Sequence, residues 1–179
     1  MSMEILDEKA EKTLRETDTF RVPVPIHLLA QRLNLGTEAL SLGALSGILV
    51  VKGDRGAIGY NSAHARVRQR FTVSHEIAHY ILHAERTEKA RLFIDKHLLF
   101  QPDEKQVSAD VRRENTEANR FASALLMPKE FVLKEIQNCD LNLDDEEAIK
   151  HLAKYFWVSS AIMANRLLNL RLLLYPAIS

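Results

Sequence analysis

The chain has 179 residues, of which 46% are hydrophobic and 27% charged, and its formal net charge at pH 7 is zero. This length accommodates one sizeable core, or one catalytic domain with a small appendage, and the balanced charge argues against a surface that binds nucleic acid generally. The single Cys139 excludes an intramolecular disulfide framework and a zinc site built from cysteines. No apolar run approaches the ~20 residues needed to cross a bilayer, and residues 1–15 do not have the pattern of a signal peptide. We therefore expect a cytoplasmic protein without a membrane anchor.

Two helices and a β-hairpin are predicted in the first third of the chain. The first helix ends near residues 17–19, and the second has Pro25 in its first turn and closes at residues 34–36. In residues 45–61, two apolar runs flank a glycine-rich turn, which favours a hairpin. Such a hairpin either offers an edge that holds an extended peptide by main-chain hydrogen bonds, or lies in the core with its edge covered.

The motif His75-Glu76-x-x-His79 lies in residues 70–83, a helical stretch with one apolar side and no proline or glycine. Residues four apart share a helix face, so His75 and His79 can direct their imidazoles to one zinc ion. Glu76 is turned about 100° from His75 and can act as a general base on a water at the metal. The alternative is a pair of partly buried histidines satisfied by carbonyls. His83 lies about 12 Å from His75 along the helix, too far for a third ligand, and its place in the last turn favours contact with unpaired carbonyls.

Residues 85–110 are polar, and we expect a short helix followed by a loop at the rim of the site. The next segment, residues 112–128, has an apolar stripe at helical spacing and ends at Pro128. A zinc site with two histidines needs a third protein ligand, and this second helix offers Glu114 and Glu117. Glu114 falls within the apolar stripe and Glu117 at its edge, so the helical wheel favours Glu114. Either glutamate can instead be a solvated helix charge.

Two motifs occur in order, residues 70–79 (RFTVSHEIAH) and residues 117–128 (EANRFASALLMP). Together they resemble the ImmA/IrrE family of zinc metallopeptidases. Residues 22–26 and 46–47 also resemble the usual lead-in of this family, so the resemblance covers roughly residues 23–128. It implies an α+β, mainly helical fold with a zincin-like metallopeptidase core, a small antiparallel β-sheet or hairpin, and a helical C-terminal tail.

The resemblance also implies a Zn²⁺ site. His75 and His79 would be ligands, Glu76 the general base, and a glutamate of the second helix the third ligand. Asn119 matches an asparagine of the family one turn after that ligand, where it can orient a ligating histidine.

The chain departs from the family at the third ligand position, because Asn115 stands where the family usually has glutamate. Asparagine is a neutral and weaker zinc ligand than a carboxylate. Either Glu114 takes the role through a small local shift, Glu117 substitutes, or the metal site is weakened. Our prediction for the metal ligands is His75, His79 and Glu114.

Family members are associated with the cleavage of a helix-turn-helix repressor or antitoxin, often the product of a neighbouring gene, which relieves transcriptional repression during stress or mobile-element induction. The resemblance therefore implies a zinc-dependent endopeptidase with such a protein as its substrate. The alternative, motivated by Asn115, is a catalytically weak or inactive scaffold that binds a repressor or DNA.

The C-terminal residues 131–179 are predicted to form a helical extension packed on a metallopeptidase-like domain of residues 1–130. Residues 152–170 have a pattern like that of a helix-turn-helix, with Trp157 in the turn where glycine is common. The zero net charge and the leucine-rich second helix favour packing or substrate docking over direct DNA binding.

Overall fold

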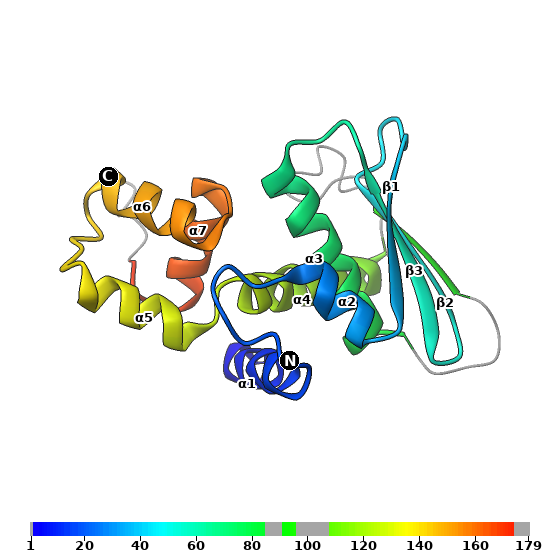
Figure 1. Cartoon of the computed structure of the whole chain (residues 1–179), viewed down its shortest axis with the longest axis horizontal. Helices are drawn as coiled ribbons and strands as arrows, with labels where there is room; N and C mark the ends of the chain where they lie inside the picture. Colours follow the sequence, from blue (N-terminus) through cyan, green and yellow to red (C-terminus); the bar gives the residue numbers. More distant parts are fainter. Residues whose placement is uncertain (1, 85–90, 96–107, 174–179) are drawn as a thin grey trace.

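The computed structural model describes residues 2–84, 91–95 and 108–173. Its elements, in chain order, are α1 (Met3–Glu16), α2 (Ile26–Arg32), β1 (Leu35–Leu40), β2 (Gly47–Lys52), β3 (Arg55–Asn61), α3 (Arg66–Leu82), β4 (Arg91–Asp95), α4 (Ala109–Leu126), α5 (Lys129–Asn138), α6 (Glu146–Phe156) and α7 (Ser160–Asn169). The sheet lies at one end of the molecule, α5 to α7 lie at the other, and α3 and α4 lie between them (Figure 1). The predicted class, α+β and mainly helical with a small sheet, is confirmed.

The sheet is mixed, with the strand order β1-β3-β2-β4. The predicted hairpin is β2 and β3, which pair antiparallel around a tight turn. Gly53 in this turn has a φ of 62°, a conformation that glycine adopts without strain. β4 also pairs antiparallel with β2, but β1 pairs parallel with β3, so the sheet is not wholly antiparallel. The hairpin therefore lies in the middle of the sheet, and the outer strands are β1 and β4.

The two outer strands differ from the elements expected from the sequence. The second helix ends at Arg32, and Asn34, with a φ of 60°, turns the chain directly into β1 at Leu35. Residues 91–95 form β4 rather than part of a short helix, because their backbone groups complete hydrogen bonds along β2. The rest of the expected helix and loop, residues 85–90 and 96–107, lies outside the described residues.

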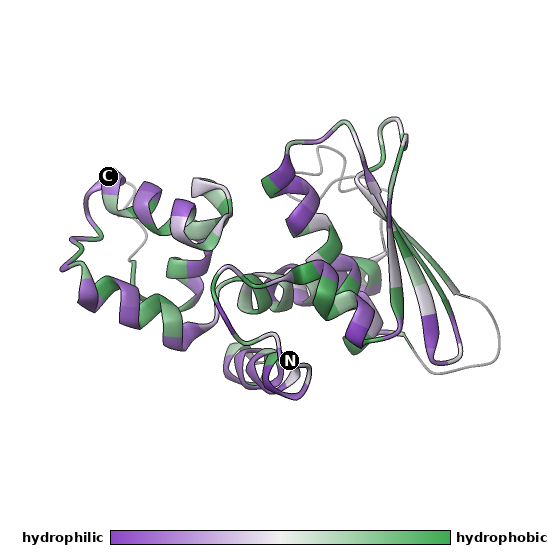
Figure 2. Cartoon of the chain, viewed as in Figure 1, coloured by the Kyte–Doolittle hydropathy of each residue, from purple (hydrophilic) through white to green (hydrophobic). Residues whose placement is uncertain are grey.

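The core forms where α3 packs on the β2 and β3 side of the sheet and against α4, which in turn contacts α1. Large side chains at this junction have at most 2% of their surface exposed, among them Phe71, Ile77, Phe121 and Leu125. In Figure 2, hydrophobic residues, drawn in green, occur on both α3 and α4 where these helices lie together. None of the described helices is long and apolar enough to cross a membrane. This packing fixes α3, which carries the histidine motif, between the sheet and α4.

A buried arginine attaches the C-terminal helices to the rest of the chain. Arg166 of α7 is fully buried, its Nε donates a hydrogen bond to the Met127 carbonyl at 3.0 Å, and its Nη1 lies 2.6 Å from Asp7 Oδ1 of α1. Arg70 of α3 makes a second link, because its Nε donates to the Trp157 carbonyl at 3.3 Å. The C-terminal helices are thus held by α1, α3 and the end of α4, and the division into residues 1–130 and 131–179 stays a prediction.

Candidate metal centre

Helix α3 buries the three ionisable residues of the histidine motif. All residues from Arg70 to His79 are buried, because this stretch of helix is covered by the sheet on one side and by α4 on another. His75 and Glu76 are each 1% exposed, and His79 is 5% exposed. Burying such groups is unfavourable unless each has a partner or changes its protonation state. Their surroundings therefore decide what they can do.

The ring nitrogens of the two histidines converge. His75 Nε2 and His79 Nε2 lie 3.0 Å apart, and the ring centroids are separated by 4.6 Å. Desolvation, with repulsion from the neighbouring imidazoles, lowers the pKa of His75 to about 3 and that of His79 to about 4. Both rings are therefore neutral near pH 7, the form in which an imidazole nitrogen offers its lone pair to a metal.

Two asparagines of α4 face this histidine pair. Asn115 Oδ1 lies 3.1 Å from His79 Nε2, and Asn119 interacts with His75 through a side-chain hydrogen bond that opposes the lowering of its pKa. Asn119 therefore acts on His75, and its role in orienting a ligating histidine stays a prediction. Asn115 thus supplies the oxygen that reaches the pair.

The three atoms His75 Nε2, His79 Nε2 and Asn115 Oδ1 fit a metal ion. In tetrahedral zinc coordination, two nitrogen ligands at ordinary bond lengths are about 3.3 Å apart, close to the 3.0 Å observed between the histidines. Each of the three atoms can offer a lone pair, and one proton can join only two of them at a time. A cation can bind all three, so the donor set suits a divalent metal.

The predicted third ligand, Glu114, lines the same pocket as His79 and precedes Asn115 in α4. Its backbone carbonyl lies 3.2 Å from His83 Nε2, so this contact of His83 is with the neighbouring helix α4 and not with the unpaired carbonyls in the last turn of α3 that the sequence suggested. Glu117, the other candidate, is not among the residues that line this pocket. The role of Glu114 as a ligand remains a prediction, and the structure adds Asn115, whose Oδ1 lies 3.1 Å from His79 Nε2.

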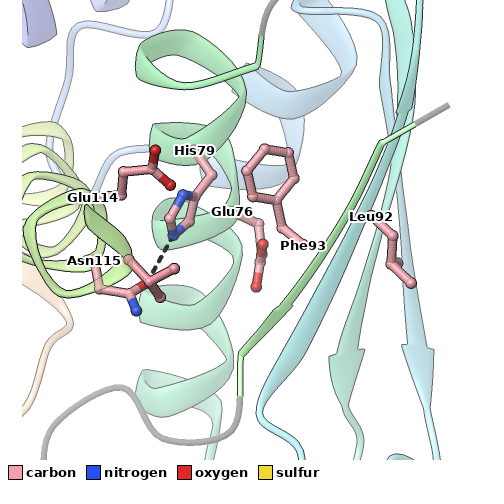
Figure 3. Close-up of a pocket in the computed structure, with 7 residues that line it drawn as sticks. Glu76, His79, Leu92, Phe93, Glu114 and Asn115 are labelled. Atoms are coloured by element: carbon pink, nitrogen blue, oxygen red, sulfur yellow. Dashed lines mark hydrogen bonds between the residues drawn. The ribbon is translucent and has the colours of Figure 1, made fainter. Parts of the chain in front are cut away.

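A pocket of about 230 Å³ opens beside the histidine pair, lined by residues of α3, β4 and α4: Glu76, His79, Leu92, Phe93, Val111, Glu114 and Asn115. Figure 3 shows Glu76 and His79 on α3, with Glu114 and Asn115 on one side and Phe93 and Leu92 on the other. The Phe93 ring lies 5.3 Å from that of His79, centroid to centroid. The pocket thus combines converging polar groups of α3 and α4 with apolar side chains, mainly of β4, and is more polar than an ordinary small-molecule site.

Gly47 of β2 leaves room for the Glu76 carboxylate. A Cβ atom at this position would lie 2.7 Å from Glu76 Oε1 and 2.5 Å from the Thr72 methyl group. Both distances are shorter than side chains tolerate, so only glycine fits the present arrangement. The sheet backbone therefore passes close beside Glu76 and fixes the space that its carboxylate occupies.

Metal-assisted hydrolysis requires metal ligands, a general base and space for the substrate. The neutral histidine pair, the adjacent buried carboxylate and the open pocket meet these requirements. Comparison with family profiles found that the profile of the IrrE N-terminal-like domain, a peptidase family termed M78, matches residues 30–168. The chain belongs to the IrrE N-terminal-like peptidase family. Comparison with curated protein sequences found no match.

Membership of this family supports a metallopeptidase type of function and confirms the resemblance seen in the sequence motifs. The match extends past α4 into α7, so α5, α6 and most of α7 belong to the matched region. A peptidase of this family acts on proteins, and its members are in general zinc-dependent.

Two features beside Glu76 and His79 have no clear signal in the sequence. The sequence places Gly47 only in a hairpin, because its closeness to Glu76 joins residues 29 positions apart. Phe93 belongs to a strand of sequence RLFID, whose apolar run has only three residues and no turn signal beside it, and such a run does not separate strand from helix.

Proposed function

We propose that the chain is a zinc-dependent endopeptidase in which His75 and His79 bind the metal and Glu76 is the general base. The observation that carries the proposal is the convergence of two neutral, buried imidazole nitrogens at 3.0 Å, next to Glu76 and open to a pocket. Family membership supports the reaction class, and the geometry supports the roles of the individual residues.

A bound zinc ion would polarise the scissile carbonyl and lower the pKa of the attacking water. Glu76 accepts a proton from that water and passes it to the leaving amine, which a carboxylate can do only if it lies within hydrogen-bonding reach of both. The backbone of Gly47 passes close to this carboxylate and restricts where it can rest. Phe93 and Leu92 line the opposite wall of the pocket, and the Phe93 ring, 5.3 Å from that of His79, keeps water from that side of the reacting groups.

We propose that the oxygen ligand comes from the first turns of α4. Asn115 Oδ1 already lies 3.1 Å from His79 Nε2, whereas Glu114 lines the pocket one residue away. The geometry therefore favours Asn115, and Glu114 becomes the ligand only if its side chain or the helix shifts. A neutral amide oxygen is a weaker zinc ligand than a carboxylate, so we expect modest metal affinity.

The proposed substrate is a protein, specifically a helix-turn-helix repressor or antitoxin in the cytoplasm. β4 is an outer strand of the sheet and contributes Leu92 and Phe93 to the pocket, so an extended substrate segment can pair with it by main-chain hydrogen bonds. α6 and α7 are joined by a tight turn at Trp157, but the basic residue of α7, Arg166, is buried against Asp7. This arrangement favours a docking or packing role for α7 over the reading of DNA bases.

The test is the hydrolysis of a quenched fluorescent peptide library, and then of candidate helix-turn-helix repressors, by zinc-loaded wild type and Glu76→Gln protein. The amide keeps the size of the side chain but cannot accept the proton, so we expect the rate to fall at least 100-fold while the zinc content is unchanged. Glu130→Gln, at a surface glutamate paired with Arg15, is the matched control. A Glu76→Gln protein that cleaves at the wild-type rate would overturn the proposed mechanism.

One observation favours a second function, a regulator that binds its partner without cutting it. Asn115 stands at the position closest to His79 and brings no negative charge to the metal. In that case, partner binding would survive both chelation and the Glu76→Gln substitution, and no cleavage products would form. The peptidase instead requires that chelation abolish cleavage and that zinc restore it.

A further inference from the structure

The geometry points to a second divalent-metal site, separate from the histidine motif, formed by Glu135, Cys139 and His151 where α5 meets α6. The ligand atoms of these three residues all lie within 4.8 Å of one another. Helices α5 and α6 lie at the end of the molecule opposite the sheet (Figure 1), so the cluster shares no residue with the pocket beside His79.

The spacing of the residues explains why the three side chains meet. Glu135 and Cys139 are four residues apart at the end of α5, so their side chains project from the same helix face. His151 lies in the middle of α6, which follows after a short connection. The cluster therefore joins two consecutive helices, and a bound ion would hold them together.

The distances within the cluster are those of hydrogen bonds and lie near the separations of ligands around one ion. His151 Nε2 lies 2.8 Å from Glu135 Oε1, and the Cys139 thiol donates to the same oxygen at 3.4 Å. Ligand atoms around a tetrahedral zinc ion are about 3.3–3.6 Å apart. Small side-chain adjustments are enough to bring the three atoms around one ion, without a change in the backbone.

The burial of Glu135 supplies an independent argument. This residue is only 8% exposed, and the groups that face its Oε1 are a thiol and an imidazole, neither of which is a permanent cation. A buried carboxylate is stabilised by a full positive charge nearby. Cys139 and His151 are both exposed, so an ion can reach the carboxylate from solvent.

The donor set selects the class of metal. One thiolate, one imidazole and one carboxylate suit zinc and neighbouring late transition metals, whereas calcium and magnesium prefer oxygen ligands alone. On binding, the Cys139 thiol releases its proton to solvent, and the His151 ring carries its proton on Nδ1 so that Nε2 can bind. Three protein ligands leave one position for water, and the site lies on the surface away from the proposed catalytic residues, which favours a structural or regulatory role.

Cobalt titration tests this site selectively. Cys139 is the single cysteine of the chain, so a thiolate-to-cobalt charge-transfer band in the near ultraviolet reports on this site and not on the histidine motif. In the full-length protein we expect the intensity of the band to saturate when one cobalt ion per chain is bound at this site. The band should disappear when zinc is added and displaces the cobalt. Zinc should also raise the Tm more in wild type than in Cys139→Ser.

Variants distinguish a three-residue site from adventitious binding to the thiol. Cys139→Ser should abolish the band, and Glu135→Gln and His151→Ala should each weaken cobalt binding at least tenfold, with circular dichroism confirming that each variant is folded. The matched controls are His27→Ala, at an exposed histidine elsewhere, and Glu147→Gln, at an exposed glutamate of α6. The proposal is overturned if wild type shows no band, or if the band is as strong in Glu135→Gln and His151→Ala as in wild type.

Discussion

Replacement of Gly47 by alanine is the sharpest test of how the sheet positions Glu76. The added Cβ would lie 2.5 Å from the Thr72 methyl group and 2.7 Å from Glu76 Oε1, whereas ordinary contacts begin at 3.4 Å. To restore that separation, the methyl group must move by about 0.9 Å and the carboxylate by about 0.7 Å. Thr72 is fully buried and cannot move freely, so we expect overpacking to lower the free energy of unfolding by about 1–3 kcal/mol.

The displacement of Glu76 has a separate, catalytic effect. A misplacement of about 1 Å in a reacting group can lower the rate by about 100-fold, so we expect Gly47→Ala to lose roughly 10- to 100-fold in peptide hydrolysis. Zinc content should stay near the wild-type value, because the substitution contacts neither histidine. Urea denaturation, elemental analysis and hydrolysis of the fluorescent peptide library measure the three quantities.

A double variant separates the two effects. Thr72→Ser deletes the methyl group that the new Cβ would meet but keeps the hydroxyl group. In the Gly47→Ala/Thr72→Ser protein we expect stability to recover to about that of Thr72→Ser alone, while hydrolysis stays low because the contact with Glu76 remains. Gly36→Ala is the matched control, since the nearest atom to its added Cβ is 3.9 Å away. A Gly47→Ala protein with wild-type stability and hydrolysis would refute the proposed positioning of Glu76.

Three further predictions concern the metal site and the packing of α7. Asn115→Asp places a carboxylate near His79 and should raise the zinc affinity at least tenfold over wild type in a competition titration with a chelator; an unchanged affinity would exclude position 115 from the coordination sphere. In metal-free folded protein, the pKa of His75 is about 3 and that of His79 about 4. In the unfolded chain, both imidazoles have the ordinary histidine pKa of about 6.5, so below that pH the unfolded chain binds more protons than the folded protein. The free energy of unfolding should therefore be retained above pH 6.5 and fall as the pH is lowered from about 6.5 towards 4; urea denaturation at several pH values measures this, and a flat profile across that range would contradict the neutral, buried pair. Arg166→Met leaves the Asp7 carboxylate without its partner and should lower the free energy of unfolding by about 3–5 kcal/mol, whereas a loss below 1 kcal/mol in the same assay would show that the ion pair does not hold α7 in place.

The helices that carry the site could be predicted because their sequence patterns are strong. Residues 70–83 and 112–128 have apolar stripes at helical spacing, and the structure places α3 and α4 there. The spacing of His75 and His79 also fixed their common face, since this geometry is internal to one helix.

The proposed oxygen ligand could not be predicted from a helical wheel. A helical wheel gives the direction of Glu114 relative to its own helix, but the oxygen that reaches His79 depends on how α4 is rotated and placed against α3. That placement results from the packing of many apolar side chains, so the wheel alone could not single out Asn115. The departure from the family pattern at position 115 was the available signal.

The outer strands were missed for a related reason. β1 has the sequence LGTEAL and does not alternate between buried and exposed positions, so it lacks the periodicity of a half-buried strand. Its extended conformation depends on parallel pairing with β3, a partner about 20 residues further along the chain. β4 likewise depends on pairing with β2.

His75 and His79 are proposed to bind one zinc ion together with an oxygen of α4. The most direct measurement is zinc per chain by elemental analysis, for protein purified without a metal-binding tag and carrying Cys139→Ser, so that the second proposed site does not contribute. We predict about one zinc per chain, lost in His79→Ala, reduced at limiting zinc in Asn115→Ala, and retained in Glu114→Ala. No zinc after supplementation, or zinc that persists in His79→Ala, would contradict the claim.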